Sequence, residues 1–394
     1  MATQAPNQQA VLGGQVQELV EQLNHVEHAL KDERIDKELR ERVGVRFQNL
    51  VTKQRKDALE LRTEVANGVA LDAAWASLQE RRAECIPLFA ECLDFVEGAL
   101  ARSIGLDRGL CRTADVLLEE LNRLTDGGWN RFTILAEGEF FYDMAEIIRV
   151  RFPEVSIWSL PVAAHEFGHY IAGTFENRSD EPLGEPFRKA SRGERQGWAY
   201  LHEHFADIFA TYALGPAYAC TCALLRFDPF TAHEAGEDHP SAVARIRFVL
   251  DALEKLDEGI GVVKQYAGVM AMLQEAWEGM VSSATGVAPE LDAAAKQELS
   301  GKLEELWPLL TDGVPTMRYQ TWLRAQGLAA TLLEQHGNMQ PLTAPVDDLR
   351  DVINAAWMAR LSGPPEAVPK LGEWAETRAR EIVAGRRDQG QGDG

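Results

Sequence analysis

The chain is short of cysteine and does not begin like an exported protein. It has five cysteines in 394 residues, an odd number: Cys85, Cys92, Cys111, Cys220 and Cys222. Residues 1–15 lack the cationic stretch and apolar core of a secretory signal. We therefore expect reduced thiols and a cytoplasmic protein.

Basic residues are also scarce, with 40 Lys and Arg against 61 Asp and Glu and a net charge of −21. This balance argues against broad nucleic-acid binding, which needs clustered cations. The longest uncharged run, residues 208–225, contains Tyr212, Tyr218 and a central Gly215-Pro216. Those residues make it a poor candidate to cross a bilayer, so we expect no membrane span. No repeat of fixed period is present, so the sequence does not favour a helical-repeat solenoid.

The most informative string is His165-Glu166-Phe167-Gly168-His169. On a helix, two histidines four residues apart lie on one face and can bind one metal ion together. In the H-E-x-x-H arrangement the histidines hold zinc and the glutamate is the general base. Gly168 costs about 1 kcal/mol inside a helix, which suggests that another element approaches closely there.

A catalytic zinc site takes three protein ligands, and a second predicted helix offers the third. Glu203 and Asp207 are four residues apart in the stretch 198–210. We expect Glu203 to bind the metal and Asp207 to accept the free ring N–H of a ligand histidine. The alternative is a solvated acidic helix edge. His202 and His204 point away from Glu203 on a helix, so we interpret them as supporting or packing residues.

These motifs resemble the gluzincin metallopeptidases, in which H-E-x-x-H is followed by a Glu-x-x-x-Asp helix. The segment from Glu203 to Ala210 with Leu214-Gly215-Pro216 is similar to a stretch of the ImmA/IrrE-type peptidases. His239-Pro240-Ser241 with Arg245-Ile246 resembles an element of the HtpX-type and CAAX-prenyl peptidases. The resemblance covers about residues 155–250, and Ala213 and Gly215 depart from the first pattern. It implies a zincin-type fold, Zn²⁺ as cofactor, and oxyanion stabilisation by His239 or Arg245.

Other polar residues near these motifs leave alternatives open. The alternative role for His239 is to cap the helix that begins at Pro240. Residues 233–239 would suit an auxiliary metal-binding loop, although a solvated acidic loop is the simpler interpretation. Tyr170, Tyr200 and Tyr212 are further hydrogen-bond donors for a tetrahedral intermediate, and no spacing selects among them.

Apolar periodicity predicts a mainly α, multihelical protein with a zincin-type core and little β-sheet. We divide it into a disordered N-terminus (1–14), an N-terminal helical bundle (15–130), a zincin-like catalytic domain (131–258), a C-terminal helical domain (259–385) and a disordered tail (386–394). Four helical segments suggest an antiparallel bundle in 15–130. Their heptad spacing leaves open a homodimer through these helices.

Within the catalytic region we predict a helix over 140–151 and strands over 131–135 and 154–158. The polar stretch 176–197 is long enough to cover the site, or is an inert surface loop. The expected activity is zinc-dependent hydrolysis of a peptide bond in a protein or peptide substrate, directed by helical flanks. The competing interpretations are a non-catalytic, zinc-stabilised helical interaction protein and a zinc hydrolase acting on another amide.

Overall fold

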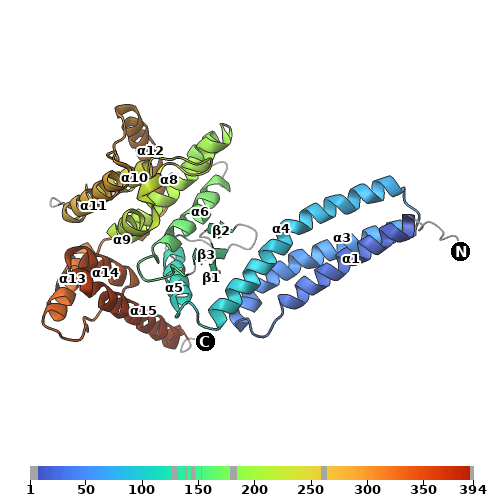
Figure 1. The fold of residues 1–394 in the computed structure, drawn as a ribbon, viewed down its shortest axis with the longest axis horizontal. Helices are drawn as coiled ribbons and strands as arrows, with labels where there is room; N and C mark the ends of the chain where they lie inside the picture. Colours follow the sequence, from blue (N-terminus) through green and yellow to red (C-terminus); the bar gives the residue numbers. More distant parts are fainter. Residues whose placement is uncertain are drawn as a thin grey trace. The chain divides into compact units, whose positions relative to one another are not determined.

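The computed structural model describes residues 8–123, 125, 132–137, 140–142, 147–151, 153–177, 184–258 and 264–390. The protein is mainly α and multihelical, as predicted, with a single small sheet among these residues (Figure 1). The chain forms two compact units. The first consists of Met1–Arg108, Asn130–Glu137 and Met144–Ile147, and the second of Gly109–Trp129, Gly138–Asp143 and Ile148–Gly394.

Three long helices make up most of the first unit: α1 (Gln8–Ala29), α3 (Val45–Ala66) and α4 (Leu71–Ser103). The short α2 (Lys37–Leu39) and a π-helical turn at Arg40–Gly44 lead into α3. The long helices pack on one another through buried apolar side chains, among them Phe47 and Phe95, whose ring centroids are 5.1 Å apart. Pro87 lies inside α4 without ending it.

Two expectations for this region need correction. The fourth predicted bundle helix, α5 (Leu110–Arg123), belongs to the second unit, where it contacts α6 and α15. Its buried side chains, such as Leu117 and Leu121, are part of that unit's core, so only three helices bundle here. Helix α1 begins at Gln8, inside the segment that we expected to be disordered. Leu12 is fully buried, which gives these residues a reason to be ordered.

The sheet contains β1 (Thr133–Ala136), β2 (Phe140–Tyr142) and β3 (Ile147–Arg151) in the order β1-β3-β2. The strand predicted at 131–135 is therefore present as β1. The helix predicted over 140–151 is wrong, because this segment forms β2 and β3. The β-branched Ile147, Ile148 and Val150 favour an extended chain. The strand predicted at 154–158 is also wrong, since Ser159 bonds back to Glu154 and Ser156 and closes a turn.

The second unit is built around α8 (Arg195–Leu214), which is buried continuously from Leu201 to Leu214. It packs against α6 (Val162–Asn177), α7 (Glu185–Ser191), α9 (Pro216–Thr221), α10 (Ala242–Glu258) and α12 (Ala293–Thr311). A π-helical turn at Cys222–Arg226 and a 3-10 turn at Pro229–Thr231 connect α9 to α10. A helix that is buried on every side lies in a core, and in α8 the buried residues include the charged Glu203 and Asp207.

The remaining helices of the second unit are α11 (Ala267–Thr285), α13 (Trp322–Gly337), α14 (Leu349–Ser362) and α15 (Val368–Gly390), with 3-10 turns at Pro315–Met317 and Pro365–Ala367. They share one hydrophobic core with α6, α8 and α10. We predicted separate domains at 131–258 and 259–385, but the helices on both sides of this boundary belong to one compact unit. Helix α15 also continues to Gly390, into the tail that we expected to be disordered.

The stretch 176–197 is more ordered than a simple loop. It contains the end of α6, all of α7 and the start of α8, and residues 178–183 lie outside the described part of the chain. None of the described helices combines the length and apolarity that crossing a bilayer requires. All five cysteines are buried and free.

Candidate metal centre

Helices α6 and α8 approach closely at Gly168. A Cβ atom at this position would lie 2.8 Å from the Cα of Ala206 and 3.2 Å from its Cβ. Glycine on one helix and alanine on the other therefore let the two backbones nearly touch. This confirms that the cost of Gly168 within a helix has a packing reason, and it brings the polar residues on either side of the contact together.

Three side chains converge there: His165 and His169 from α6 and Glu203 from α8. The Nε2 atoms of the two histidines are 3.3 Å apart. The Nε2 atom of His169 is 3.3 Å from Glu203 Oε1, and that of His165 is 3.5 Å from Glu203 Oε2. His165 and Glu203 are buried, and His169 is partly exposed. Donor atoms of all three residues lie within 4.8 Å of one another, so the group could hold a metal ion.

These spacings fit a tetrahedral zinc site. With metal–ligand distances of about 2.0–2.1 Å, neighbouring ligand atoms of a tetrahedron are about 3.3–3.4 Å apart. Two histidines and one carboxylate are also a donor set found in catalytic zinc sites. Glu203 Oε2 is buried, and it has ionic contacts with Arg245 and His165 but no hydrogen bond of good geometry. The residues present therefore fit zinc, although the geometry alone does not identify the metal.

Two residues hold the opposite side of the His165 ring. Tyr218 donates its only proton to Asp207 Oδ1 over 2.5 Å, and its oxygen lies 2.9 Å from His165 Nδ1. Nδ1 is also 3.1 Å from Asp207 Oδ1. Because Tyr218 has no second proton to give, Nδ1 must carry the hydrogen, which leaves the Nε2 lone pair facing His169 and Glu203. This is the tautomer that a metal ligand requires.

Arg245 joins the two carboxylates of α8. Its Nε and NH2 atoms donate to Asp207 at 2.8 and 2.7 Å, and its NH1 atom lies 2.8 Å from Glu203 Oε2. The guanidinium also stacks over the Phe227 ring, 4.9 Å from its centroid. This arrangement favours a positioning role for Arg245 over the predicted oxyanion role, because its nitrogens already reach the two acidic side chains.

The charges of this cluster are strongly coupled. Burial alone would raise the pKa of Glu203 and of Asp207, but Arg245 and the neighbouring histidines outweigh burial and hold both values well below the usual range. Burial alone would lower the pKa of His165, but its contacts with Asp207 and Glu203 raise it. Both carboxylates are therefore ionised at neutral pH.

Glu166 follows His165 in the sequence, and its side chain is buried. Its Oε1 atom lies 3.6 Å from Arg226 NH2. Arg226 ends the π-helical turn that follows α9. His239 is at the rim of the cluster, where its side chain is 62% exposed and its Nε2 lies 3.4 Å from Glu203 Oε1. It is not one of the three grouped donors, and its side chain is open to solvent.

His202 and His204 are outside the three-residue group, although the His202 ring stacks on that of His169 with centroids 6.5 Å apart. His202 packs between Trp198 and Phe187, and His204 against Phe248, with ring centroids 4.1, 5.0 and 4.5 Å apart. Burial lowers the pKa of His202 and of His204 to about 4. Both are packing residues, as expected.

The tyrosine candidates differ in their contacts. The Tyr200 hydroxyl donates to the carbonyl of Gly236 at 2.7 Å and so ties down the loop that carries His239. Tyr212 points to Pro315, with its hydroxyl 3.3 Å from that carbonyl oxygen, and Tyr170 packs on Phe167. Residues 233–239 form no further metal-binding group among the described residues.

Sequence reasoning missed Tyr218 and Arg226. The one signal for Tyr218 was a hydroxyl inside an otherwise uncharged, buried run, and nothing in the local pattern indicated which residue it would meet. No family model matches this chain, and no curated protein or solved structure is significantly similar to it.

Proposed function

We propose that this protein is a zinc-dependent metallopeptidase. The observation that carries the proposal is the convergence of His165, His169 and Glu203 at spacings that suit a tetrahedral zinc ion. The intact H-E-x-x-H sequence adds a carboxylate, Glu166, next to the first ligand. A purely structural metal site has no need of that base.

Each residue has a role in this proposal. His165, His169 and Glu203 hold the metal, which when bound would polarise the peptide carbonyl and acidify a water molecule. Glu166 accepts the proton of the attacking water on a carboxylate oxygen and delivers it to the leaving amine. The exposed imidazole of His239 donates a hydrogen bond to the carbonyl oxygen as negative charge develops there.

A substrate chain also needs a backbone partner. Strand β2 is at one end of the β1-β3-β2 order, and it contacts α6. An end strand presents unpaired N–H and C=O groups with which an extended peptide can pair. A peptide held along β2 would run beside the helix that carries two of the proposed ligands, which supports an extended protein segment as substrate.

The test combines metal analysis with cleavage of a library of unstructured peptides, read by mass spectrometry. Wild-type protein should bind one zinc and cleave, and Glu166→Gln should bind the same zinc but lose cleavage. Glu176→Gln, on the same helix and outside the three-residue group, is the matched control and should retain both properties. Zinc binding with identical behaviour of all three proteins would support a structural site instead, and no zinc binding would reject the proposal.

A further inference from the structure

The junction between α8 and α9 connects two parts of the candidate metal centre. Helix α8 carries Glu203 and Asp207, and α9 carries Tyr218, whose hydroxyl contacts Asp207 and His165. The two helices are joined by Gly215, which has a φ of 61°. That conformation lies outside the range that other residues adopt easily, so the turn needs support from elsewhere.

Asn354 of α14 gives that support. Its Nδ2 atom donates to the carbonyl of Leu214, the last residue of α8, at 2.8 Å. Its Oδ1 atom accepts from the backbone N–H of Ala217, in the first turn of α9, at 3.0 Å. A third bond, to the carbonyl of Arg350, fixes the amide to its own helix at 2.8 Å. One fully buried side chain therefore satisfies the end of one helix and the start of the next.

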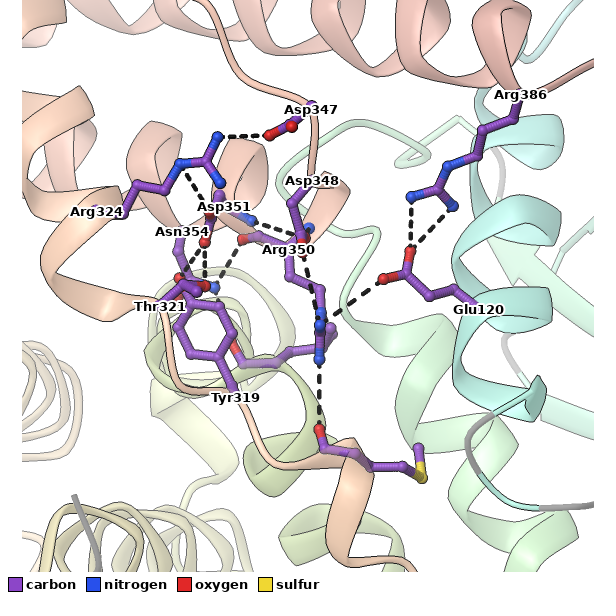
Figure 2. Close-up of polar contacts among 12 residues, drawn as sticks. Glu120, Tyr319, Thr321, Arg324, Asp347, Asp348, Arg350, Asp351, Asn354 and Arg386 are labelled. Carbon is purple, nitrogen blue, oxygen red and sulfur yellow. Dashed lines mark hydrogen bonds and ion pairs between the residues drawn. The ribbon is translucent and has the colours of Figure 1, made fainter. Parts of the chain in front are cut away.

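Tyr319 supports the same turn from a second direction. Its backbone N–H donates to the carbonyl of Tyr212 at 2.9 Å. Its ring fills the space next to Gly215, where a Cβ atom would lie 2.5 Å from the ring. Its hydroxyl donates to the buried Asp351 at 2.9 Å, and Thr321 donates to the same oxygen. Figure 2 shows Tyr319 and Thr321 bonded to Asp351, and Asn354 bonded to Arg350 on the same helix as Asp351.

We infer that Asn354 is a positioning residue for the metal centre, acting through the α8–α9 junction on Tyr218. With the junction fixed, the Tyr218 hydroxyl reaches both Asp207 Oδ1 and His165 Nδ1, and so sets the tautomer and direction of a metal ligand. The C-terminal helices thus contribute to metal binding although none of their side chains belongs to the His165-His169-Glu203 group. This inference rests on the proposed zinc site.

The experiment is a double-mutant cycle on zinc affinity with the full-length chain. Zinc dissociation constants are measured by chelator competition for wild type, Asn354→Ala, Tyr218→Phe and the double variant, with thermal unfolding recorded for each. The Co²⁺-substituted proteins give absorption spectra that report the ligand geometry. Asp257→Ala is the matched control, because Asp257 is also buried and accepts two backbone N–H groups, those of Gln265 and Tyr266, but bonds neither α8 nor α9.

We expect Asn354→Ala and Tyr218→Phe each to weaken zinc binding about 10- to 100-fold and to change the Co²⁺ spectrum. The double variant should bind no more weakly than Tyr218→Phe alone, since both changes act on one contact. The control should be less heat-stable but bind zinc as wild type does. If Asn354→Ala does not fold, Asn354→Asp, which keeps the oxygen facing Ala217, is measured in the same way.

The inference is overturned if the Asn354 variant loses heat stability but keeps the wild-type zinc affinity and Co²⁺ spectrum. It is also overturned if the two effects simply add in the double variant. A wild-type protein that binds neither zinc nor cobalt gives a different result, because it rejects the proposed function itself and the inference with it.

Discussion

Replacing Gly168 by alanine tests how the candidate metal centre is assembled. The new Cβ would lie 2.8 Å from the Cα of Ala206, whereas carbon atoms in contact prefer about 3.5–4.0 Å. The helices must therefore separate by roughly 1 Å, because backbone atoms at the contact cannot rotate away. Metal–ligand distances tolerate only about 0.2 Å. Two histidines on α6 and a glutamate on α8 could then no longer bind one ion well.

Stability and metal binding should respond differently to this change. Overpacking costs about 1–3 kcal/mol, while alanine gains about 1 kcal/mol over glycine in a helix, so the net loss of unfolding free energy is about 0–2 kcal/mol. Changes to groups that only support the ligands already cost about 10- to 100-fold in metal affinity. Displacing Glu203 from both histidines should therefore weaken zinc binding at least about 100-fold.

The assay is chelator competition for zinc combined with urea unfolding of the metal-free protein. Gly173→Ala is the matched control, since Gly173 is on the same helix with no neighbour within 4 Å of its would-be Cβ. It should be neutral or stabilise by up to about 1 kcal/mol and leave zinc affinity unchanged. Wild-type zinc affinity in Gly168→Ala, or an equal loss in both variants, would show that close packing of α6 on α8 does not hold the three ligands together.

Three further outcomes are expected. First, the pKa of the buried His204 is lowered to about 4, so the unfolded chain binds more protons and stability is lost as pH falls from about 6.5 towards 4. One pH unit corresponds to about 1.4 kcal/mol, so the drop in unfolding free energy from pH 7 to pH 4 should be about 3 kcal/mol smaller in His204→Phe than in wild type. Urea unfolding at the two pH values measures this drop, and the control His25→Phe, at an exposed position, should leave it unchanged. Second, Arg245→Met leaves two buried carboxylates without their cation and should cost about 3–5 kcal/mol of unfolding free energy. Arg247→Met, which breaks a surface ion pair, should cost about 0–1 kcal/mol. Equal losses in the two variants would contradict the role of Arg245 as the cation that neutralises Glu203 and Asp207. Third, His239→Ala should keep its zinc but lower kcat for peptide cleavage about 10²- to 10³-fold, and loss of the metal instead would show that this histidine is a ligand.

Sequence reasoning reached the parts of this molecule that depend on local periodicity. The spacing of His165 and His169 and of Glu203 and Asp207 fixes which side chains share a helix face. An otherwise costly glycine at 168 indicates where two helices meet. The mainly α fold follows from the same patterns, because long amphipathic segments are rarely ambiguous.

The errors occurred where tertiary contacts decide the outcome. Residues 140–142 and 147–151 form strands that we predicted as one helix, because short apolar runs carry no clear period and the sheet partners decide their conformation. Arg245 contacts Asp207, which is 38 positions away in the chain, and Tyr218 contacts His165, which is 53 positions away. Nothing local specifies such pairs. The same holds for Asn354, which is 140 residues from the helix end that it caps.

The most direct test of the zinc site is zinc K-edge X-ray absorption of the purified protein at one equivalent of metal. We predict a single shell of nitrogen and oxygen ligands at about 2.0–2.1 Å, with the outer-shell signature of two imidazoles. Glu203→Gln should change this shell, and His169→Ala should not hold the metal. A sulfur shell at about 2.3 Å, or a wild-type spectrum unchanged in both variants, would contradict the assignment of these three residues as ligands.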